Sequence, residues 1–418
     1  MASKKNNLQP VRGTQDILPD ENRLHRHVEN VAFLTAELYG FGEISTPLFE
    51  FTDVFSRTLG DTSDIVTKEM YNFKDRGGDQ LTLRPEGTAG VARALISNGL
   101  AQNLPLKYFY RGPMFRYERP QKGRRRQFHQ VGVELLGVAG TQADIEVIAL
   151  AQHFLSALGM DHAITLELNT LGDTESRDTY RAKLLDYLAI YKDDLSDDSR
   201  ERFEKNPLRI LDSKEEGDRR IIVDAPLLKD SLNDISRHFF DDLQEGLTRL
   251  AIPYELNDKL VRGMDYYCHT AFEFTSTDLG AQGTVLAGGR YDGLVSEMGG
   301  PSTPGIGWAA GVERLSMLVQ TAPEGQRPIA VIPTGQDTET DALMLAHRLR
   351  RRGFRIEHGY TGNVGKRMKR ANTANARAAI ILGDDEISRN VGLIRDMDSG
   401  EQTEVSMDLI DNFLSKLK

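Results

Sequence analysis

The segment from residue 107 to residue 136 restricts the fold of this 418-residue chain more than any other part of the sequence. Side chains two positions apart lie on the same face of a β-strand. In the first half of the segment, one face would carry Tyr108, Tyr110, Gly112, Met114, Arg116 and Glu118. In the second half, the matching face would carry Phe128, Gln130, Gly132, Glu134 and Leu136. The pattern predicts a long antiparallel hairpin whose glycines leave space for a ligand above polar side chains.

The same hairpin is strongly basic near its turn. Against the single acid Glu118, sixteen residues hold Arg111, Arg116, Arg119, Lys122, Arg124, Arg125 and Arg126. The planar guanidinium of arginine binds phosphate oxygens bidentately. We expect this role for Arg116, which shares a face with Gln130 and Glu134. A solvated charged loop remains an alternative for residues 122–126.

Two other segments place polar side chains next to turns. In the segment 81–88, an alternating strand runs into the start of a helix, with Pro85 near its first turn. Glu86 could face a ligand there, or it could simply be an acid favoured by the helix dipole. The segment 260–267 gathers an arginine, an acid and two tyrosines around Gly263. Paired tyrosines are also common in ordinary cores.

Composition excludes several classes of protein. No run approaches the ~20 apolar residues of a membrane-spanning helix, and no secretory signal is visible, so we expect a cytoplasmic protein. Cys268 is the single cysteine, which rules out an internal disulfide and leaves no cysteine cluster for zinc. The motifs G-x-x-x-x-G-K-[ST], H-E-x-x-H and G-x-S-x-G are absent. The net charge of −10 argues against a nucleic-acid partner unless the basic residues are clustered.

The order of patterns along the chain indicates several modules. Residues 20–39 carry a helical stripe, and the charge-rich, helix-like residues 175–248 suggest an insertion. A linker composition at 321–328 precedes alternating strands and helices, which predict an α/β domain of about 90 residues dominated by a parallel sheet. In this domain Lys366, Arg367, Lys369 and Arg370 form a basic cluster. It suits phosphate contacts or is an exposed helix face.

In combination, these segments resemble a known family. In order, the chain contains Glu86-Gly87-Thr88, Phe115-Arg116-Tyr117-Glu118, Arg262-Gly263-Met264-Asp265-Tyr266-Tyr267, Gly288-Gly289-Arg290-Tyr291-Asp292-Gly293 and the segment from Gly305 to Leu315. Residues 41–47 resemble the first motif of the class II aminoacyl-tRNA synthetases, Phe115–Glu118 the second and Gly305–Leu315 the third. The segments 262–267 and 288–293 resemble the histidyl-tRNA synthetase family in particular.

The resemblance implies an α+β catalytic domain over residues 1–324, with an antiparallel sheet flanked by helices and a helical insertion at about 175–248. It also implies a C-terminal α/β anticodon-binding domain over residues 328–418 and a homodimer. The implied activity is that of a histidine–tRNA ligase. Histidine would be activated by ATP to histidyl-adenylate with release of pyrophosphate, and then transferred to the 3′-terminal adenosine of histidine tRNA. Mg²⁺ would accompany ATP, and no zinc would be needed.

The resemblance also implies roles for individual residues. The catalytic and ATP-binding residues would be Arg116 on the α-phosphate, Arg314 on the γ-phosphate, Arg262 across the α-phosphate, and Glu118. Histidine would be bound by Glu86, Thr88, Gln130, Glu134, Tyr266 and Tyr267. The tRNA would contact Gln121, Lys122 and Arg124 near its acceptor end, and Lys366 and Arg367 near its anticodon.

One alternative within the resemblance is a regulatory protein. A paralogue of the family serves as a non-catalytic, histidine-sensing subunit of ATP phosphoribosyltransferase. Such proteins typically lack the C-terminal domain and have lost catalytic positions, whereas this chain has both. The sequence departs from the family pattern at Cys268, His269 and Trp308, and we expect Cys268 to be a core residue rather than a nucleophile.

Overall fold

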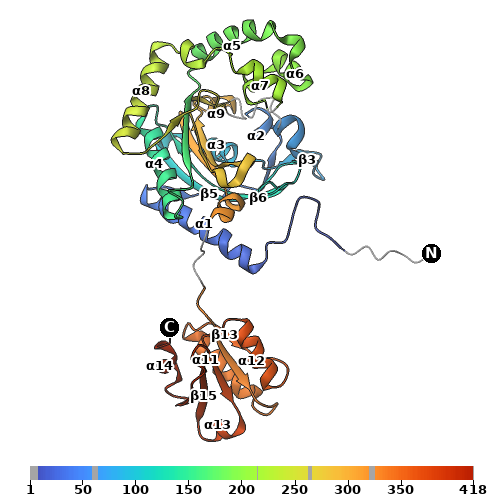
Figure 1. Ribbon diagram of the computed structural model, residues 1–418, viewed down its shortest axis with the longest axis vertical. Coiled ribbons are helices and arrows are strands. Elements are labelled where there is room, and N and C mark those ends of the chain that lie inside the picture. Colours follow the sequence, from blue (N-terminus) through green and yellow to red (C-terminus); the bar gives the residue numbers. More distant parts are fainter. Residues whose placement is uncertain (1–7, 59–64, 214, 262–265, 320–324, 418) are drawn as a thin grey trace, which may run out of the picture. The chain divides into compact units, whose positions relative to one another are not determined.

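The predicted hairpin lies inside an eight-stranded sheet in the computed structural model of the chain (Figure 1), which describes residues 8–58, 65–213, 215–261, 266–319 and 325–417. Neighbouring strands are antiparallel except at the two edges, where β1 and β8 join in parallel. The strand order is β1 (Gly42–Glu43), β5 (Leu106–Phe115), β6 (Gln127–Leu136), β11 (Gly305–Gly311), β10 (Thr284–Arg290), β9 (Cys268–Thr275), β7 (Thr165–Thr170) and β8 (Glu255–Leu256). In the hairpin, Tyr108 pairs with Glu134 and Gly112 with Gln130, so the predicted residues do share one face.

The two faces of this sheet have separate cores. Odd-numbered hairpin residues such as Phe109 and Val133 pack against four helices: α1 (Pro19–Leu38), α4 (Gln142–Ala157), α8 (Asp234–Arg249) and α10 (Val312–Leu318). There the Trp308 ring stacks on Phe154, with ring centres 5.8 Å apart. Even-numbered residues such as Tyr110 face a second core that contains α2 (Asp53–Ser56), α3 (Thr88–Ser97) and α9 (Leu294–Glu297).

A small antiparallel sheet lies beside α3. Its strand order is β2 (Phe49–Phe51), β4 (Gln80–Leu83) and β3 (Tyr71–Lys74). The helix α3 begins at Thr88, so Pro85 precedes it by three residues and lies near its first turn, as predicted. The strand–turn–helix order of this segment is also the one that the sequence pattern predicts.

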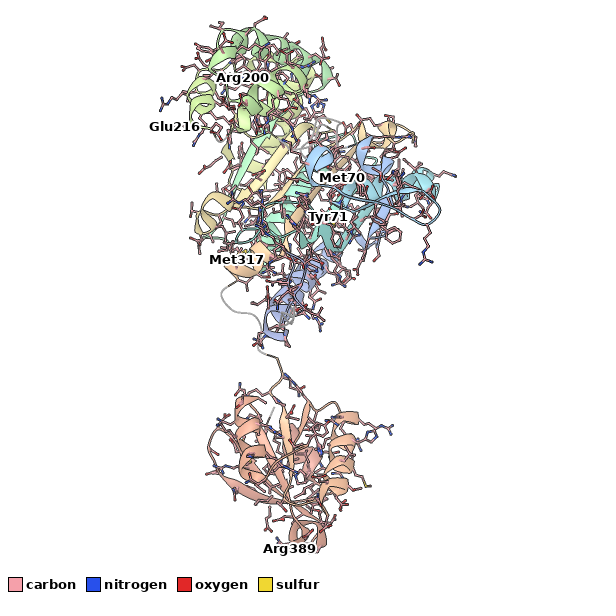
Figure 2. The ribbon with its side chains drawn as sticks, turned by 90° about the vertical axis from the view of Figure 1, so that its right-hand side faces the viewer. Met70, Tyr71, Arg200, Glu216, Met317 and Arg389 are labelled. Atoms are coloured by element: carbon pink, nitrogen blue, oxygen red, sulfur yellow. The ribbon has the colours of Figure 1, made fainter. Side chains whose placement is uncertain are left out.

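The helical insertion has a core of its own. It contains α5 (Thr174–Ala189), α6 (Asp197–Lys205) and α7 (Glu216–Ile222). Its buried residues include Tyr180, Leu184 and Leu188 of α5, together with Ile210 and Leu228 of the short connecting segments. Arg200 and Glu216 mark its exposed surface (Figure 2). The helical character continues through α8 as predicted, but Leu243 and Leu247 of α8 pack into the core under the large sheet. The helix α8 therefore packs with the large sheet.

The chain divides into two units, 1–322 and 323–418. In the second unit, the strand order is β13 (Ile356–His358), β12 (Ile329–Pro333), β14 (Ala378–Leu382), β15 (Val391–Asp396) and β16 (Gln402–Ser406). Its helices are α11 (Glu339–Arg351), α12 (Val364–Thr373), α13 (Asp384–Ser388) and α14 (Ile410–Ser415). The first three strands are parallel, but β15 and β16 are antiparallel. The sheet is therefore mixed, and the sequence pattern did not predict the last two strands.

Among the described residues, none of the helices has the length and apolar character needed to cross a membrane.

Candidate active site

A cavity of about 250 Å³ lies on the even-numbered face of the hairpin, between β6, β10 and β11. Most of the predicted site residues that the structure describes meet there: its walls include Glu86, Thr88, Arg116, Glu118, Arg124, Gln130, Tyr267 and Arg314. Glu134 and Tyr266 lie behind these walls and are almost fully buried. The predicted residues Arg262–Asp265 fall outside the described residues.

The glycines of the hairpin face serve the packing of other side chains rather than leaving open space. A Cβ atom on Gly132 would lie 2.4 Å from Cζ of Tyr110, and one on Gly112 would lie 2.6 Å from Nη2 of Arg84. Gly112 also has a φ of +142°, which side-chain-bearing residues rarely adopt. The expectation of empty space above these glycines is therefore wrong, because Tyr110 and Arg84 fill it.

Glu86 is held against the N-terminus of α3. Its carboxylate accepts the backbone N–H groups of Thr88 at 2.6 Å and Ala89 at 2.8 Å. Burial raises the pKa of Glu86, while these amide hydrogen bonds and the nearby Arg116 oppose the rise. The two roles considered from the sequence are thus compatible, since Glu86 interacts with the helix terminus and also lines the cavity.

Behind the cavity lies a buried hydrogen-bonded group that we call the polar floor: Thr88, Glu134 and Tyr291. Thr88 donates its hydroxyl hydrogen to Oε1 of Glu134 at 2.6 Å, and the Tyr291 hydroxyl donates to Oε2. Glu134 is 0% exposed, and burial raises its pKa to about 8. Gly307 makes room for this carboxylate, because a Cβ atom there would overlap Oε2. The sequence pattern gave no role to Tyr291, and only its place in the 288–293 motif marked it.

Aromatic rings close the floor. The rings of Tyr266 and Tyr267 lie 4.5 Å apart, and the Tyr291 ring meets both at steep angles. Of the pair, Tyr267 reaches the cavity and Tyr266 packs behind it. Oε1 of Gln130 is buried and has no hydrogen-bond partner among the described residues, so the cavity wall presents an unsatisfied acceptor. A polar ligand would satisfy it.

The opposite side of the cavity forms what we call the arginine wall: Arg116, Arg124 and Arg314. Backbone carbonyls orient two of the guanidiniums, since Arg116 donates to Pro85 O at 2.9 Å and Arg314 to Thr284 O at 2.6 Å. Arg124 pairs with Glu118 at 2.7 Å. Burial and the charge of Arg124 lower the pKa of Arg314. Three guanidiniums against one carboxylate leave a positive wall suited to phosphates.

The predicted tRNA-binding residues differ in exposure. Gln121 and Lys122 lie exposed on the hairpin turn, and Arg124 lies beside them at the cavity mouth. In the second unit Lys366 is exposed, but Arg367 is only 7% exposed. Arg367 donates to Pro333 O at 2.9 Å and Gly362 O at 2.7 Å, and it pairs with Glu339. The predicted tRNA role of Arg367 is therefore corrected to a structural one.

Two further features concern metals and thiols. Cys268 is buried, and burial raises its pKa to about 12, so it is a core thiol as expected. His25, His129 and Glu313 lie together, with ligand atoms within 4.8 Å of one another, although no cluster was foreseen. Both oxygens of Glu313 accept the backbone N–H of His129 at 3.0 Å, and His129 Nδ1 lies 2.9 Å from Oε1. The hydrogen bonds between His129 and Glu313 explain why these side chains lie together without a metal ion. The expectation that the protein needs no zinc stays a prediction.

The sequence pattern also missed a buried ion pair beside the site. Arg290 and Asp144 are both 0% exposed and form an ion pair, and Arg290 also pairs with Asp292 at 3.0 Å. Arg290 belongs to the 288–293 motif, but Asp144 lies far away in the sequence on α4. The pair fixes the end of β10 next to Tyr291, which donates to Glu134 within the polar floor.

Comparisons with known proteins match this geometry. A family model described as Histidyl-tRNA synthetase covers residues 13–174, and one described as Anticodon binding domain covers residues 328–417. The histidine–tRNA ligase of Rhodospirillum rubrum is 63% identical over 98% of this chain and 99% of its own length. The chain belongs to the histidyl-tRNA synthetase family. The histidine–tRNA ligase of Gluconacetobacter diazotrophicus is 55% identical over the same shares of the two chains.

A solved structure agrees with the family. The apo histidyl-tRNA synthetase of S. aureus superposes with a TM-score of 0.81 at 33% identity, over 97% of this chain and 99% of that one. Membership of the class II aminoacyl-tRNA synthetases, an enzyme family, is thereby confirmed, as is the predicted fold class. The regulatory alternative is not favoured, because ligases match nearly the whole chain at high identity.

Proposed function

We propose that the chain joins histidine to ATP as histidyl-adenylate and then transfers histidine to the terminal ribose of histidine tRNA. The observation that carries this proposal is the presence of two unlike surfaces in one cavity. A buried polar floor suits a small polar side chain, and an arginine wall suits a triphosphate. Attack of the histidine carboxylate on the α-phosphate needs both reactants held side by side and negative charge stabilised at phosphorus.

Histidine brings a cationic amine, a carboxylate and an imidazole with one donor and one acceptor nitrogen. We assign the amine to Glu86 and Thr88, and the carboxylate side to the amide of Gln130. We assign the imidazole to Glu134 and Tyr267, with Tyr266 packed behind. An amino acid without matching groups would leave polar groups of the site unpaired, such as Oε1 of Gln130, which gives roughly 10⁴-fold discrimination without an editing site.

ATP would lie along the arginine wall. Arg116 would contact the α-phosphate and Arg314 the γ-phosphate, with Arg262 across the α-phosphate and Glu118 nearby. Mg²⁺ usually binds through phosphates and one or two carboxylates. Glu118 and Glu273 fit that need, since Glu118 lines the cavity and Glu273 lies close enough to act on the pKa of Arg314. The bound ion would neutralise charge on the departing pyrophosphate.

The tRNA would reach the cavity through a groove of about 1140 Å³. Arg116, Arg124 and Arg314 line both the groove and the cavity, so the groove leads to the reacting atoms. We assign Gln121, Lys122 and Arg124 to the acceptor end and Lys366 to the anticodon region. A homodimer and a cytoplasmic location complete the proposal as the family resemblance implies them.

Histidine-dependent ATP–pyrophosphate exchange tests the proposal, with each other amino acid supplied in turn as a control. We expect exchange with histidine, loss of exchange in Arg262→Ala, and partial rescue in Arg262→Lys. Circular dichroism of each variant checks that folding is kept. Unchanged exchange in Arg262→Ala would overturn the role of that residue, and no exchange in the parent chain would overturn the activity.

A further inference from the structure

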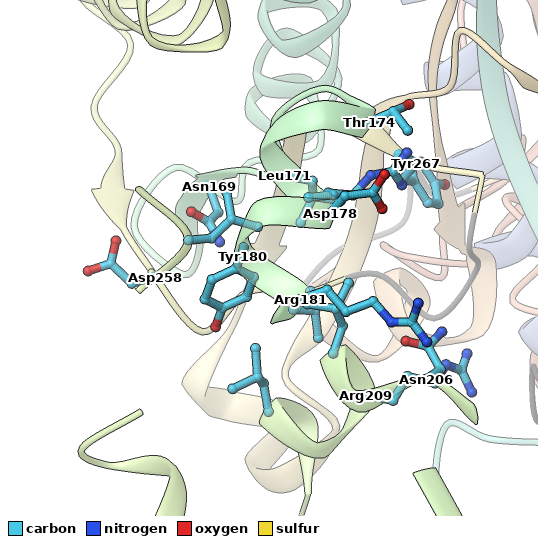
Figure 3. A pocket seen from close by; sticks show the side chains of 15 residues that line it. Asn169, Leu171, Thr174, Asp178, Tyr180, Arg181, Asn206, Arg209, Asp258 and Tyr267 are labelled. Atoms are coloured by element: carbon cyan, nitrogen blue, oxygen red, sulfur yellow. The ribbon is translucent and has the colours of Figure 1, made fainter. Parts of the chain in front are cut away.

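A second cavity of about 210 Å³ lies on the far side of Tyr267, between the helical insertion and the large sheet (Figure 3). The apolar part of its lining comes from both bodies: Leu171, Tyr180, Leu208, Leu211, Leu228 and Val261. A cavity of roughly 150 Å³ accommodates a benzene ring. This cavity is therefore large enough for an aromatic ring with a short chain attached.

One side of this second cavity is cationic. Arg181 of α5 lies there with Asn206 and Arg209, as Figure 3 shows, while Tyr180 and Asp258 lie on the opposite side. Arg181 forms no ion pair with any residue that the structure describes. Two acids also line the cavity: Asp258, which pairs with Lys229 at 2.8 Å, and Asp178, which lies near Tyr267 in Figure 3. The guanidiniums of Arg177, Arg181 and Arg209 outnumber these two carboxylates. Neighbouring guanidiniums beside an apolar floor favour an anion that carries an apolar body.

The second cavity is linked to the first by direct contacts. Tyr267 lines both cavities. Arg177 of α5, which lines the second cavity, donates to the backbone carbonyl oxygen of Tyr267 at 2.7 Å. A ligand that packs against Tyr267 and α5 therefore touches the same residue that forms the wall of the first cavity.

Hydrogen bonds hold the N-terminus of α5 in place against the N-terminus of α8. Asp173 caps α5 through the backbone N–H of Ser176 at 2.8 Å, and it accepts the side-chain amide of Asn233 at 2.8 Å. Asn233 in turn caps α8 through Ser236 at 2.9 Å. Because α8 packs on the catalytic core, the two helices are tied to the sheet at this point.

We propose that the second cavity binds a small organic acid with an apolar body, and that its occupation strengthens histidine binding through Tyr267. The carboxylate lies against Arg181 and Arg209, and the apolar body packs on Leu208 and the ring of Tyr267. The ring of Tyr267 already packs on Tyr266 and Tyr291, and a ligand on its other side would add contacts that hold this wall of the first cavity in position for histidine. The coupling rests on the proposed function, whereas acid binding does not.

Calorimetric titration of the full chain with 3-phenylpropionate, without histidine, tests the cavity alone. We expect saturable binding with a Kd below about 1 mM, and binding about tenfold weaker for the uncharged 3-phenylpropionamide. Arg181→Gln weakens the acid about tenfold, and Leu208→Phe fills the cavity and abolishes binding. Arg200→Gln, another exposed arginine of the insertion, leaves it unchanged. Absence of binding, or equal binding in all three variants, would overturn the site.

A second titration measures histidine binding with and without saturating 3-phenylpropionate. We expect histidine to bind about fivefold tighter with the acid present, and the acid to bind tighter by the same factor with histidine present. Leu208→Phe removes the effect of the acid. Unchanged histidine affinity would overturn the coupling. If histidine fails to bind under either condition, the proposed function fails, and the first titration still decides the site.

Discussion

The arginine wall lines the cavity, the polar floor lies behind it and reaches it through Thr88, and the two are built in opposite ways. In the floor, Glu134 is fully buried, and side-chain hydroxyls bond both of its oxygens. In the wall, Arg116 and Arg124 remain 21% and 37% exposed, and backbone carbonyls hold Arg116 and Arg314. The floor is thus a closed network with fixed geometry, whereas the wall is a set of charges that stay in contact with solvent.

The difference teaches how one cavity can handle two substrates. A buried network recognises shape and hydrogen-bond pattern, because any mismatch leaves a desolvated group without a partner. A solvated set of guanidiniums attracts a flexible polyanion through charge, which needs less exact fit but is screened by salt. Substitutions in the arginine wall should therefore affect the turnover of ATP, and substitutions in the polar floor should affect the binding of histidine.

The largest effect should come from removing one guanidinium of the arginine wall. We expect Arg314→Ala to lower histidine-dependent ATP–pyrophosphate exchange by about 10²–10³-fold, because a preorganised cation facing the phosphates is lost. Histidine affinity, measured by calorimetry, should change less than twofold. Arg314→Lys, which keeps the charge, serves as the control and should retain more activity. An equal loss of histidine affinity would show that the wall and the floor are not separate.

Removing one hydrogen bond of the polar floor should have a smaller effect, on the KM for histidine rather than on ATP. Tyr291→Phe removes the hydroxyl that bonds Oε2 of Glu134, and we expect the KM for histidine to rise about tenfold while the KM for ATP stays constant. Steady-state exchange kinetics measure both values. Tyr187→Phe is the matched control, since it removes a hydroxyl that bonds Ile221 O inside the insertion. A rise in the KM for ATP would contradict the assignment.

The buried charge state of the floor predicts a pH dependence of stability. Burial raises the pKa of Glu134 from 4.5 to about 8, so between these values the folded chain holds a proton that the unfolded chain releases. The resulting stability is fully present below the lower value and falls as pH rises through the window, by at most about 1.4 kcal/mol per pH unit. Glu134→Gln should flatten this slope in urea denaturation series. Identical slopes in the two proteins would refute the raised pKa.

The smallest expected effect is that of ionic strength, which should change ATP affinity more than histidine affinity. As ionic strength rises from about 0.05 to 0.15 M, we expect ATP affinity to fall a few-fold, because the wall is partly exposed to solvent. Histidine affinity should stay nearly constant over the same range, since the floor is buried. Calorimetric titrations of each ligand at matched ionic strengths give both values. Parallel losses would indicate that one mechanism governs both ligands.

The hairpin could be predicted well because the pattern that specifies it lies within one continuous segment of the sequence. A period of two over thirty residues determines which side chains share a face, and a register shift of one residue would bury the charged set. Arg116 and Gln130 therefore meet in the cavity as predicted. The strand β16 was missed because its exposed positions carry polar residues, which resemble a loop until the strand pairs. The strand β15 was missed because only Gly392 and Ile394 are buried along it, which makes its pattern weak.

Other features depend on contacts that no local pattern encodes. Arg290 and Asp144 lie 146 residues apart in the sequence, and only the fold brings them together. The helical pattern of α8 does not reveal that it packs under the sheet rather than inside the insertion. A basic residue such as Arg367 looks like its neighbour Lys366 in sequence, although one points into its domain and the other outward. In each of these cases, the position of the residue or helix depends on partners that lie far away in the sequence.

Trp308, which stacks on Phe154 beneath the cavity and donates its ring N–H to Val147 O at 3.1 Å, is the single tryptophan of the chain. Tryptophan emission therefore comes from the first of the two units alone, and the second unit contributes none. Loss of that emission maximum on heating would follow the catalytic unit, whereas the helical signal in circular dichroism would follow both. The unfolding of the first unit can thus be followed on its own, in an unlabelled and unmodified chain.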